Sequence, residues 1–420
     1  MSEKLQPVRG THDLLPADFA RHQHVIETAQ NVAALYGYAR MDTPIFEFSD
    51  VFHRTLGDTS DVVTKETYTF MDRGGESLTL RPEFTAAIVR SFISNNLQQL
   101  PSPFKCFYAG PAFRYERPQK GRQRQFHQIG CELLGSNEPL SDVEMIALAA
   151  HTLRVMHLFD SVTLELNSLG DAESRTAYRE ALVEYLSAYK NDLSDDSKAR
   201  LEKNPLRILD SKDEGDKKIV AGAPTLHAHF NEASKAHFNA VKAGLEVLSI
   251  AYKVSEKLVR GLDYYSHTVF EFTTDKLGAQ GTVLAGGRYN DLVELMGGND
   301  TACIGFAAGV ERLSALIENI YKPHPTQLVA VVPMQDSTEV AAWQLAQNLR
   351  TEGCIVDIAY KGNSKKRFER ASKLGAAYAV LLGEEELAKG EVMVKNLTDG
   401  SQRAVARAEL LTVLDKLLEK

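Results

Sequence analysis

Residues 124–134 show the clearest alternation of polar and apolar positions in the chain. Positions 129, 131 and 133 are apolar, whereas the even-numbered positions hold Gln128, Gly130 and Glu132. Because successive side chains of a strand point to opposite faces, this pattern predicts a strand with one face in the core and one polar face. The glycine between an amide and a carboxylate is expected to leave room for a ligand on the polar face.

A second strand is predicted at 107–113, and the same rule places Arg114 and Glu116 on one of its faces. The loop between the two strands, 116–122, is polar and contains proline and glycine. The pair therefore predicts a hairpin that presents a charged loop.

Shorter elements precede this hairpin. An amphipathic helix is predicted at Asp18–Leu35, and strands are predicted at 67–70 and 77–80 around a glycine-rich turn. Pro44–Glu47 is predicted to form an extended turn, because proline disfavours helix at the residue before it.

Helical spacing dominates 171–248, which is charged and rich in alanine, with apolar positions at Tyr178, Leu182, Tyr185 and Leu186. Strand-like sequence resumes at Ala251, so this region is predicted to be a helical insertion. Farther along, 303–309 predicts a strand that runs into a helix. The residues expected to face the core from that helix are Leu313, Leu316, Ile317 and Ile320.

The last part of the chain follows a predicted linker at Tyr321–Pro325. Apolar strands at 328–333, 353–359 and 376–381 alternate with helical segments, which predicts a parallel α/β domain. The resulting division of the chain is 1–170, a helical insertion at 171–250, a resumed first domain at 251–322, and an α/β domain at 323–420.

The composition agrees with several domains, since 420 residues exceed one ordinary core. Hydrophobic residues make up 44% of the chain and charged residues 25%, as is typical of soluble globular proteins. No secretory signal and no membrane span are predicted, and the protein is expected to be cytoplasmic. The cysteines are scattered and are expected to be reduced and buried; they are Cys106, Cys131, Cys303 and Cys354. A net charge of −8 excludes a surface that is basic throughout but allows local basic patches.

The segment Arg260–Tyr265 combines an arginine, a glycine, a carboxylate and two phenols. Arginine holds oxyanions in a planar fork, and tyrosine suits a small polar aromatic ligand. The chain has neither a Gly-x-x-x-x-Gly-Lys-Ser/Thr loop nor a Gly-x-Gly-x-x-Gly turn after a strand. Phosphates are therefore expected to be held by side chains.

The charged hairpin loop offers such side chains, although a solvated basic loop is the alternative interpretation. Its basic residues are Arg114, Arg117, Lys120, Arg122 and Arg124. Glu83 and Thr85 lie where a strand gives way to a helix, a position that suits either an ammonium ligand or a simple helix cap. Gly309 and Arg312 lie one helical turn apart, so a flat ring is expected to pass over the glycine beneath the arginine.

These motifs resemble the bacterial-type histidyl-tRNA synthetases, a family of class II aminoacyl-tRNA synthetases. The resemblance covers essentially the whole length of the chain and is carried by Arg9–Asp13, Thr79–Glu83, Phe113–Arg122, Arg260–Tyr265 and Gly305–Leu313. It implies an α+β fold: a catalytic core built on an antiparallel six-stranded sheet and divided between 1–170 and 251–322, the helical insertion, and an anticodon-binding domain at 323–420. It also implies a homodimer, with Pro44 in the dimer motif.

The resemblance implies that ATP-dependent histidylation of tRNA(His) proceeds through a histidyl-adenylate, with Mg²⁺ accompanying ATP and pyrophosphate. L-Histidine would contact Glu83, Thr85, Gln128, Glu132, Arg260, Tyr264 and Tyr265. ATP would contact Arg114, Glu116, Gly309 and Arg312, with Arg114 and Arg260 as the catalytic pair. The acceptor end of the tRNA would contact Arg117, Gln119, Lys120 and Arg122, and the anticodon stem a basic stripe at 361–373. No metal site built from protein side chains is expected.

Two departures from the family pattern are visible. Phe84 stands where the bacterial pattern usually has glycine and is expected to reshape the wall beside Glu83, and Ser266-His267 replaces the usual Thr-Gly. Adjacent Tyr264 and Tyr265 reach one ligand only if the chain turns at that point. The alternative functions are the synthetase-like regulatory subunit of ATP phosphoribosyltransferase, which lacks an anticodon domain, and a different class II synthetase.

Overall fold

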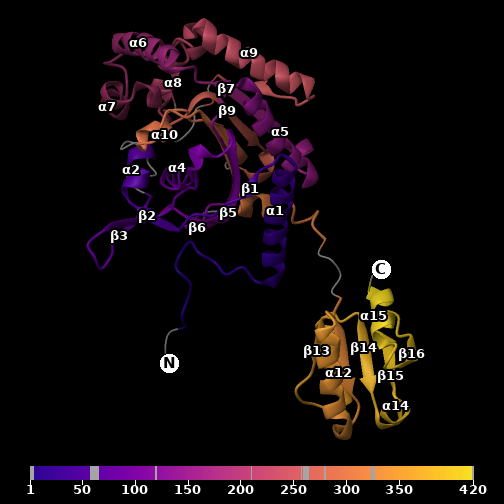
Figure 1. Cartoon of the computed structure of the whole chain (residues 1–420). Helices are drawn as coiled ribbons and strands as arrows, with labels where there is room; N and C mark the ends of the chain where they lie inside the picture. The colour runs from indigo at the N-terminus through magenta and orange to yellow at the C-terminus, as the bar shows by residue number, and fades with distance from the viewer. Residues whose placement is uncertain are drawn as a thin grey trace. The chain divides into compact units, whose positions relative to one another are not determined.

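The chain divides into two compact units, Met1–Tyr321 and Lys322–Lys420 (Figure 1). The computed structural model describes residues 4–56, 66–118, 121–209, 211–256, 258, 264–278, 281–322 and 327–418. Among these residues, no helix combines the length and the apolar character needed to cross a bilayer.

An eight-stranded sheet forms the centre of the first unit. Its strands, in spatial order, are β1 (Ala39–Arg40), β5 (Phe104–Phe113), β6 (Gln125–Leu134), β11 (Cys303–Gly309), β10 (Thr282–Arg288), β9 (Ser266–Thr273), β7 (Thr163–Ser168) and β8 (Lys253–Val254). The six inner strands pair antiparallel, and the two short edge strands pair parallel. The expected six-stranded antiparallel core is therefore confirmed, with one short strand added at each edge.

One face of this sheet carries the main hydrophobic core. Helices α1 (Pro16–Leu35), α5 (Pro139–Val155) and α11 (Val310–Leu316) pack there, against the apolar positions 129, 131 and 133 of β6. Proline occupies the first turn of α1 and of α5, where its missing N–H costs nothing. Leu313 and Ile317 join the core, but Ile320 is 42% exposed because α11 ends at Leu316, so its predicted core position is wrong.

The opposite face supports a second core and the functional cavity. Helices α2 (Asp50–Leu56), α4 (Thr85–Ser94) and α10 (Leu292–Leu295) pack there around buried aromatic rings. A small antiparallel sheet lies next to them, in the order β2 (Phe46–Phe48), β4 (Ser77–Leu80), β3 (Tyr68–Met71). Phe46 and Glu47 thus begin a strand rather than the predicted turn.

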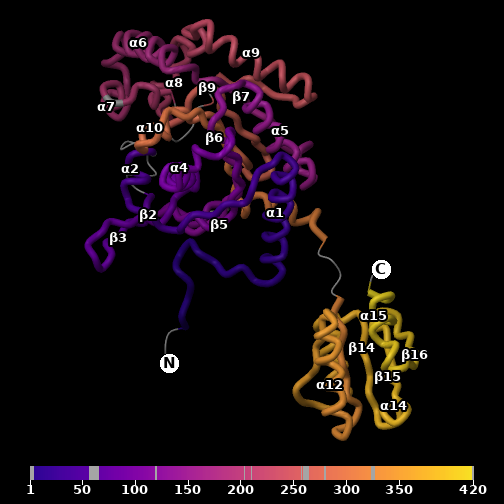
Figure 2. The backbone as a smooth tube through the Cα atoms, viewed as in Figure 1, coloured from indigo at the N-terminus to yellow at the C-terminus, as the bar shows by residue number. Residues whose placement is uncertain are grey.

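Four helices lie between β7 and β8: α6 (Ala172–Ala188), α7 (Asp195–Lys203), α8 (Glu214–Val220) and α9 (Glu232–Val247). Figure 2 shows that the chain leaves the sheet after β7, passes through these helices and returns to the sheet. Tyr178, Leu182 and Leu186 line one side of α6 and form a separate small core. Asp171 caps α6 by accepting a hydrogen bond from the Ser174 N–H at 2.8 Å.

The second unit has a five-stranded sheet in the order β13 (Val356–Ile358), β12 (Val329–Pro333), β14 (Tyr378–Leu382), β15 (Glu391–Asn396), β16 (Gln402–Ala406). Its helices are α12 (Glu339–Thr351), α13 (Ser364–Lys373), α14 (Glu384–Lys389) and α15 (Leu410–Leu418). The first three strands pair parallel, but β15 and β16 pair antiparallel. The parallel pairing predicted for the first three strands is therefore confirmed, and the structure adds two antiparallel strands that the sequence pattern did not indicate.

The predicted basic stripe of α13 also needs correction. Arg367 is buried, donates to the Pro333 carbonyl at 3.1 Å and pairs with Glu339. Arg370 pairs with Asp357 at 2.9 Å. Four exposed lysines of the stripe are not engaged in this way, namely Lys361, Lys365, Lys366 and Lys373.

Candidate active site

A cavity of about 360 Å³ opens on the polar face of β6, β10 and β11 and reaches the first residues of α4 and α11. It gathers most of the site residues predicted from the sequence. Those that line it are Glu83, Thr85, Arg114, Glu116, Arg122, Gln128, Glu132, Tyr264, Tyr265, Gly309 and Arg312. Arg117 is exposed and lies outside the lining, whereas Gln119, Lys120 and Arg260 fall outside the described residues.

Glu132 on β6 is the most enclosed acid of the cavity, with 1% of its surface exposed. Its carboxylate accepts hydrogen bonds from Thr85 Oγ1 at 2.8 Å, from the Tyr289 hydroxyl at 2.5 Å and from the Tyr108 hydroxyl at 3.3 Å. Burial raises the pKa of Glu132 to about 8, although these three donors act in the opposite direction. Glu132 thus lines the cavity as a buried carboxyl that is able to accept a further hydrogen bond from a ligand.

Gly305 on the neighbouring strand β11 makes this arrangement possible. It pairs with Glu132 in the sheet, and a Cβ atom at position 305 would lie 1.6 Å from Glu132 Oε2. No side chain fits there, so the glycine provides the volume that the carboxylate occupies.

The role predicted for Gly130 is wrong. A Cβ at this position would lie 2.2 Å from the Tyr108 hydroxyl and 2.4 Å from the Phe306 carbonyl oxygen, so protein atoms fill the space expected for a ligand. Tyr108 on β5 pairs directly with Gly130, and its hydroxyl crosses above the glycine to reach Glu132. The glycine therefore makes room for a supporting phenol.

Phe84 lies behind the cavity rather than in its wall, contrary to expectation. Its ring is fully buried, stacks on Tyr108 with centroids 4.4 Å apart, and lies 3.7 Å from the Arg81 guanidinium. Arg81 is also buried and donates to the Pro111 and Thr43 carbonyls at 2.8 and 2.6 Å. This stack holds the Tyr108 ring against Gly130.

The structure confirms the helix-cap interpretation of Glu83, whereas the ammonium-ligand interpretation stays a prediction. Its carboxylate accepts the N–H groups of Thr85 and Ala86 at 2.6 and 2.8 Å, so it caps the first turn of α4. It also lines the cavity. Burial raises the pKa of Glu83, with the two backbone donors acting against it.

Tyr264 and Tyr265 both line the cavity, with ring centroids 4.7 Å apart. Both precede β9, which begins at Ser266, so the alternation of a strand does not separate them. Gln128 lines the same space, and its Oε1 is buried without a hydrogen-bond partner among the described residues. A buried acceptor of this kind needs a donor, and a ligand is able to supply one.

His267 occupies the position where the family pattern has glycine, and its φ of 45° lies in the left-handed region that favours glycine. Burial lowers the pKa of its imidazole to about 4, and the neighbouring His237 and Arg288 act in the same direction. His267 stacks on His237 with centroids 4.8 Å apart, and this contact accommodates the larger side chain.

Three arginines gather at another part of the cavity. Arg114 donates to the Pro82 carbonyl at 2.9 Å, and Arg122 pairs with Glu116 at 3.2 Å. Arg114 and Glu116 follow the end of β5, so the prediction that they share a face of that strand is wrong. Their side chains nevertheless approach each other to 4.0 Å.

Arg312 on α11 donates to the Gly121 and Thr282 carbonyls at 3.2 and 2.7 Å and lies beside Gly309. Burial lowers the pKa of Arg312, and the charges of Arg122 and Arg114 act in the same direction. Because three guanidinium groups lie close together here, this part of the cavity attracts an anion.

Tyr289, Tyr108 and Gly305 were not identified from the sequence as site residues. Tyr289 lies 157 positions from the carboxylate to which it donates, and no local pattern reports such a contact. Only a weak sequence signal marks Tyr108 as a site residue, namely its place on a strand predicted to pair with β6.

The family model described as "Histidyl-tRNA synthetase" matches residues 10–313, and the model described as "Anticodon binding domain" matches residues 328–417. The chain belongs to the histidyl-tRNA synthetase family. It is 56% identical over 416 residues to a histidine–tRNA ligase of Rhodospirillum rubrum, with 99% of each chain covered. It is 54% identical over 402 residues to that of Gluconacetobacter diazotrophicus, with 96% of each covered. The crystal structure of apo S. aureus histidyl-tRNA synthetase superposes with a TM-score of 0.85 at 35% identity, covering 98% of this chain and 100% of that one.

We predict that Gly305→Ala displaces the Glu132 carboxylate from its donors, because the new methyl group would occupy the position of Oε2. The free energy of unfolding, measured by urea denaturation, should fall by about 1–3 kcal/mol. Gly309→Ala on the same strand is the matched control, since its Cβ would meet Arg312 at an ordinary 3.7 Å. Equal stability of the two variants would show that Gly305 does not make room for the carboxylate.

Proposed function

We propose that this protein is a class II histidine–tRNA ligase, which attaches L-histidine to tRNA(His) at the expense of ATP. The carboxylate of histidine attacks the α-phosphorus of ATP to give histidyl-adenylate and pyrophosphate. The terminal ribose hydroxyl of the tRNA then takes the histidyl group, and AMP leaves. The observation that carries this proposal is one cavity that combines buried carboxyls and paired tyrosines with a cluster of arginines.

The carboxyl groups and the tyrosines suit an amino acid that has a polar ring. Glu83, Thr85 and Glu132 offer oxygen acceptors that would hold the α-ammonium group, and Gln128 would contact the carboxylate. Tyr264 and Tyr265 would line the imidazole, which fits between aromatic faces and hydrogen-bonding hydroxyls. A pocket that hydrogen-bonds the imidazole rejects side chains that lack this group, because its own polar groups would then remain unpaired.

The arginines suit the triphosphate. Arg114 would bind the α-phosphate, and Arg312 would stack on adenine above Gly309 or hold the γ-phosphate. Arg260 would lie against the α-phosphate and the attacking carboxylate. Fixed cations at these places stabilise the charge that grows on the phosphate oxygens in the transition state.

Glu116 would repel phosphate, so its carboxylate is better suited to accept a hydrogen bond from the ribose or the adenine amino group. ATP would enter as its Mg²⁺ complex, in which the cation binds phosphate oxygens and neutralises the departing pyrophosphate.

The hairpin loop would meet the acceptor end of the tRNA. Arg117 is exposed, and Arg122 reaches the cavity through its pair with Glu116, so the described parts of the loop lie at the surface and at the site. Gln119 and Lys120 belong to the same proposal, with Gln119 reading a base edge. We assign the catalytic core to 1–170 and 251–322, the helical insertion to 171–250 and anticodon binding to 323–420.

A homodimer is also proposed. Phe46, Phe48 and Phe70 lie on one face of the small sheet and are 48%, 57% and 46% exposed. Exposed aromatic side chains gathered in this way mark an interaction surface.

Sedimentation should give twice the 46.5 kDa chain mass, and Phe48→Glu should reduce it to one chain because a buried charge opposes association. Val247→Glu, at an 83% exposed position of α9, is the control and should leave the mass unchanged. A monomeric wild-type protein at micromolar concentration would rule the dimer out.

The first reaction step is tested by pyrophosphate exchange into ATP, with each amino acid supplied in turn. We expect exchange with histidine, and a loss of at least about 10²-fold in Arg114→Ala and Arg260→Ala, since each removes a cation from the developing charge. Arg179→Ala, at an exposed position of α6, is the control. Exchange with none of the amino acids would favour the regulatory-subunit alternative, and exchange with a different one would overturn the histidine assignment.

The second unit offers an RNA-stacking surface. Trp343, the one tryptophan of the chain, stacks on Tyr360 with ring centroids 5.8 Å apart and planes 19° apart. Tyr360 is 83% exposed, and the exposed Lys361, Lys365 and Lys366 follow it in the chain. An open aromatic face beside lysines suits an unpaired base and its phosphate.

We predict that tRNA(His) quenches the Trp343 fluorescence, because a base stacked on Tyr360 changes the surroundings of the indole. Tyr360→Ala should weaken tRNA binding by roughly 1–3 kcal/mol, about 5- to 150-fold, and leave pyrophosphate exchange unchanged. The control is Val340→Ala, an exposed apolar position on the same helix as Trp343. Unaltered tRNA affinity in Tyr360→Ala would remove the ring from the RNA surface.

A further inference from the structure

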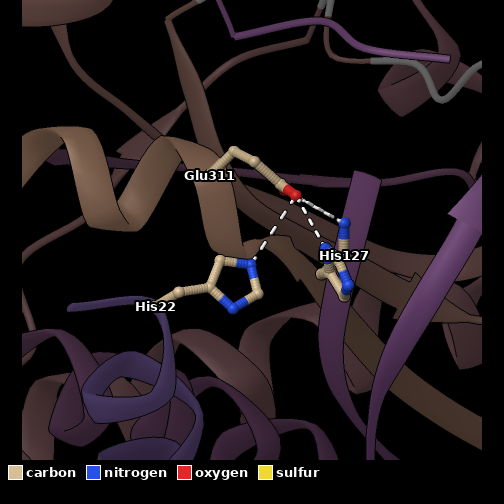
Figure 3. Close-up of side chains that lie close together, drawn as sticks. All are labelled: His22, His127 and Glu311. Atoms are coloured by element: carbon tan, nitrogen blue, oxygen red, sulfur yellow. Dashed lines mark hydrogen bonds and ion pairs between the residues drawn. The ribbon is translucent and has the colours of Figure 1, made fainter. Parts of the chain in front are cut away.

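Two histidines and a glutamate from three separate elements converge beside the active-site cavity. Figure 3 shows His22 of α1, His127 of β6 and Glu311 of α11 with their side chains directed toward one another. One ligand atom from each lies within 4.8 Å of the others. The two imidazole rings meet edge to face, with centroids 4.5 Å apart.

The carboxylate of Glu311 is held by a backbone N–H group as well as by a side chain of the cluster. The backbone N–H of His127 donates to Oε1 and Oε2 at 2.9 and 3.0 Å, and His127 Nδ1 lies 2.9 Å from Oε1. Backbone donors of this kind orient carboxylates that bind metal ions. The carboxylate therefore has a defined direction, toward the space between the two rings.

His22 completes the cluster and contacts Glu311 only at long range. Its side chain is 5% exposed, and Nε2 is buried without a hydrogen-bond partner among the described residues. The distance from Nε2 to Glu311 Oε1 is 3.7 Å, too long for a hydrogen bond. A buried ring nitrogen left in this state costs free energy, and a ligand between it and the carboxylate would remove that cost.

Two imidazoles and one carboxylate are a ligand set of zinc sites that keep an open position. Ligand atoms about 2.0–2.1 Å from a tetrahedral zinc lie roughly 3.3 Å apart. The two separations from Glu311 Oε1 are 2.9 and 3.7 Å, and all three ligand atoms lie within 4.8 Å of one another, so small side-chain shifts would bring them to that spacing. We propose that His22, His127 and Glu311 form a binding site for one divalent transition-metal ion, with Zn²⁺ the best match among imidazole-seeking ions.

A second cavity, of about 240 Å³, gives the site its entry path and room for a water ligand. His22 and Glu311 line it together with His12 and Asp18. Glu311 and Arg312 also line the active-site cavity, so the ion would lie in the wall that the two cavities share. Three elements far apart in the sequence would be joined there by one ion, without involving the phosphates of ATP.

The proposed metal site does not depend on the proposed catalytic function, because the ion would bind in the absence of ATP, histidine and tRNA. The full chain is freed of metal with a chelator, dialysed against micromolar Zn²⁺ or Co²⁺, and assayed for bound metal. We expect one ion per chain, a visible Co²⁺ spectrum typical of nitrogen and oxygen ligands, and a rise in the thermal unfolding temperature with Zn²⁺.

His22→Ala and His22→Gln should each weaken binding by more than about 100-fold, since even groups that only orient metal ligands contribute 10- to 100-fold. His24→Ala, at an exposed position of the same helix, is the matched control and should bind as the wild type does. Circular dichroism of the metal-free variants separates loss of the site from loss of the fold. The proposal is overturned if the wild type binds no ion, if the His22 variants bind as tightly as His24→Ala, or if the Co²⁺ spectrum shows thiolate ligation.

Discussion

The enclosure of the Glu132 carboxylate is the constraint on which the cavity depends. Thr85 approaches it from the start of α4, Tyr108 from β5 and Tyr289 from the residue after β10, while Gly305 of β11 leaves the space open. A buried carboxyl without these donors would be strongly unfavourable, so each element is held in position by its contact with one group. The central sheet and the helix N-terminus are thereby fixed relative to each other at the point where a ligand would bind.

The most buried carboxyls of the cavity lie apart from its arginines. Its two most buried carboxyls, Glu132 and Glu83, lie on β6 and just before α4, whereas its guanidinium groups come from the hairpin and from α11, where Glu116 and Glu311 accompany them. The arginines are held by backbone carbonyl oxygens, at Pro82 for Arg114 and at Gly121 and Thr282 for Arg312. Carbonyl acceptors orient a guanidinium without carrying a negative charge of their own.

The sequence permitted prediction of those features that a single segment carries. The polar face of β6 and the position of Glu83 at a helix start follow from local alternation and capping, and the adjacent tyrosines follow from their motif; the structure places all of these at the cavity. Tyr289 and His22 were missed because their partners lie 157 and 289 positions away, and only the closed sheet brings them together. Gly130 shows a different limit of prediction from sequence. A glycine indicates that space is needed at its position, but it does not identify the atom that fills this space. The basic stripe needed correction at Arg367 for a related reason, because charge alone does not distinguish an exposed arginine from one that is buried and paired with a glutamate.

The raised pKa of Glu132 sets the proton content of the pocket. Burial raises this pKa to about 8, which favours the protonated, uncharged form of the carboxyl when no ligand is bound. An ammonium ion is bound best by the ionised form, so its arrival below pH 8 displaces that proton to solvent. The site thus exchanges a proton for the ammonium group as it fills.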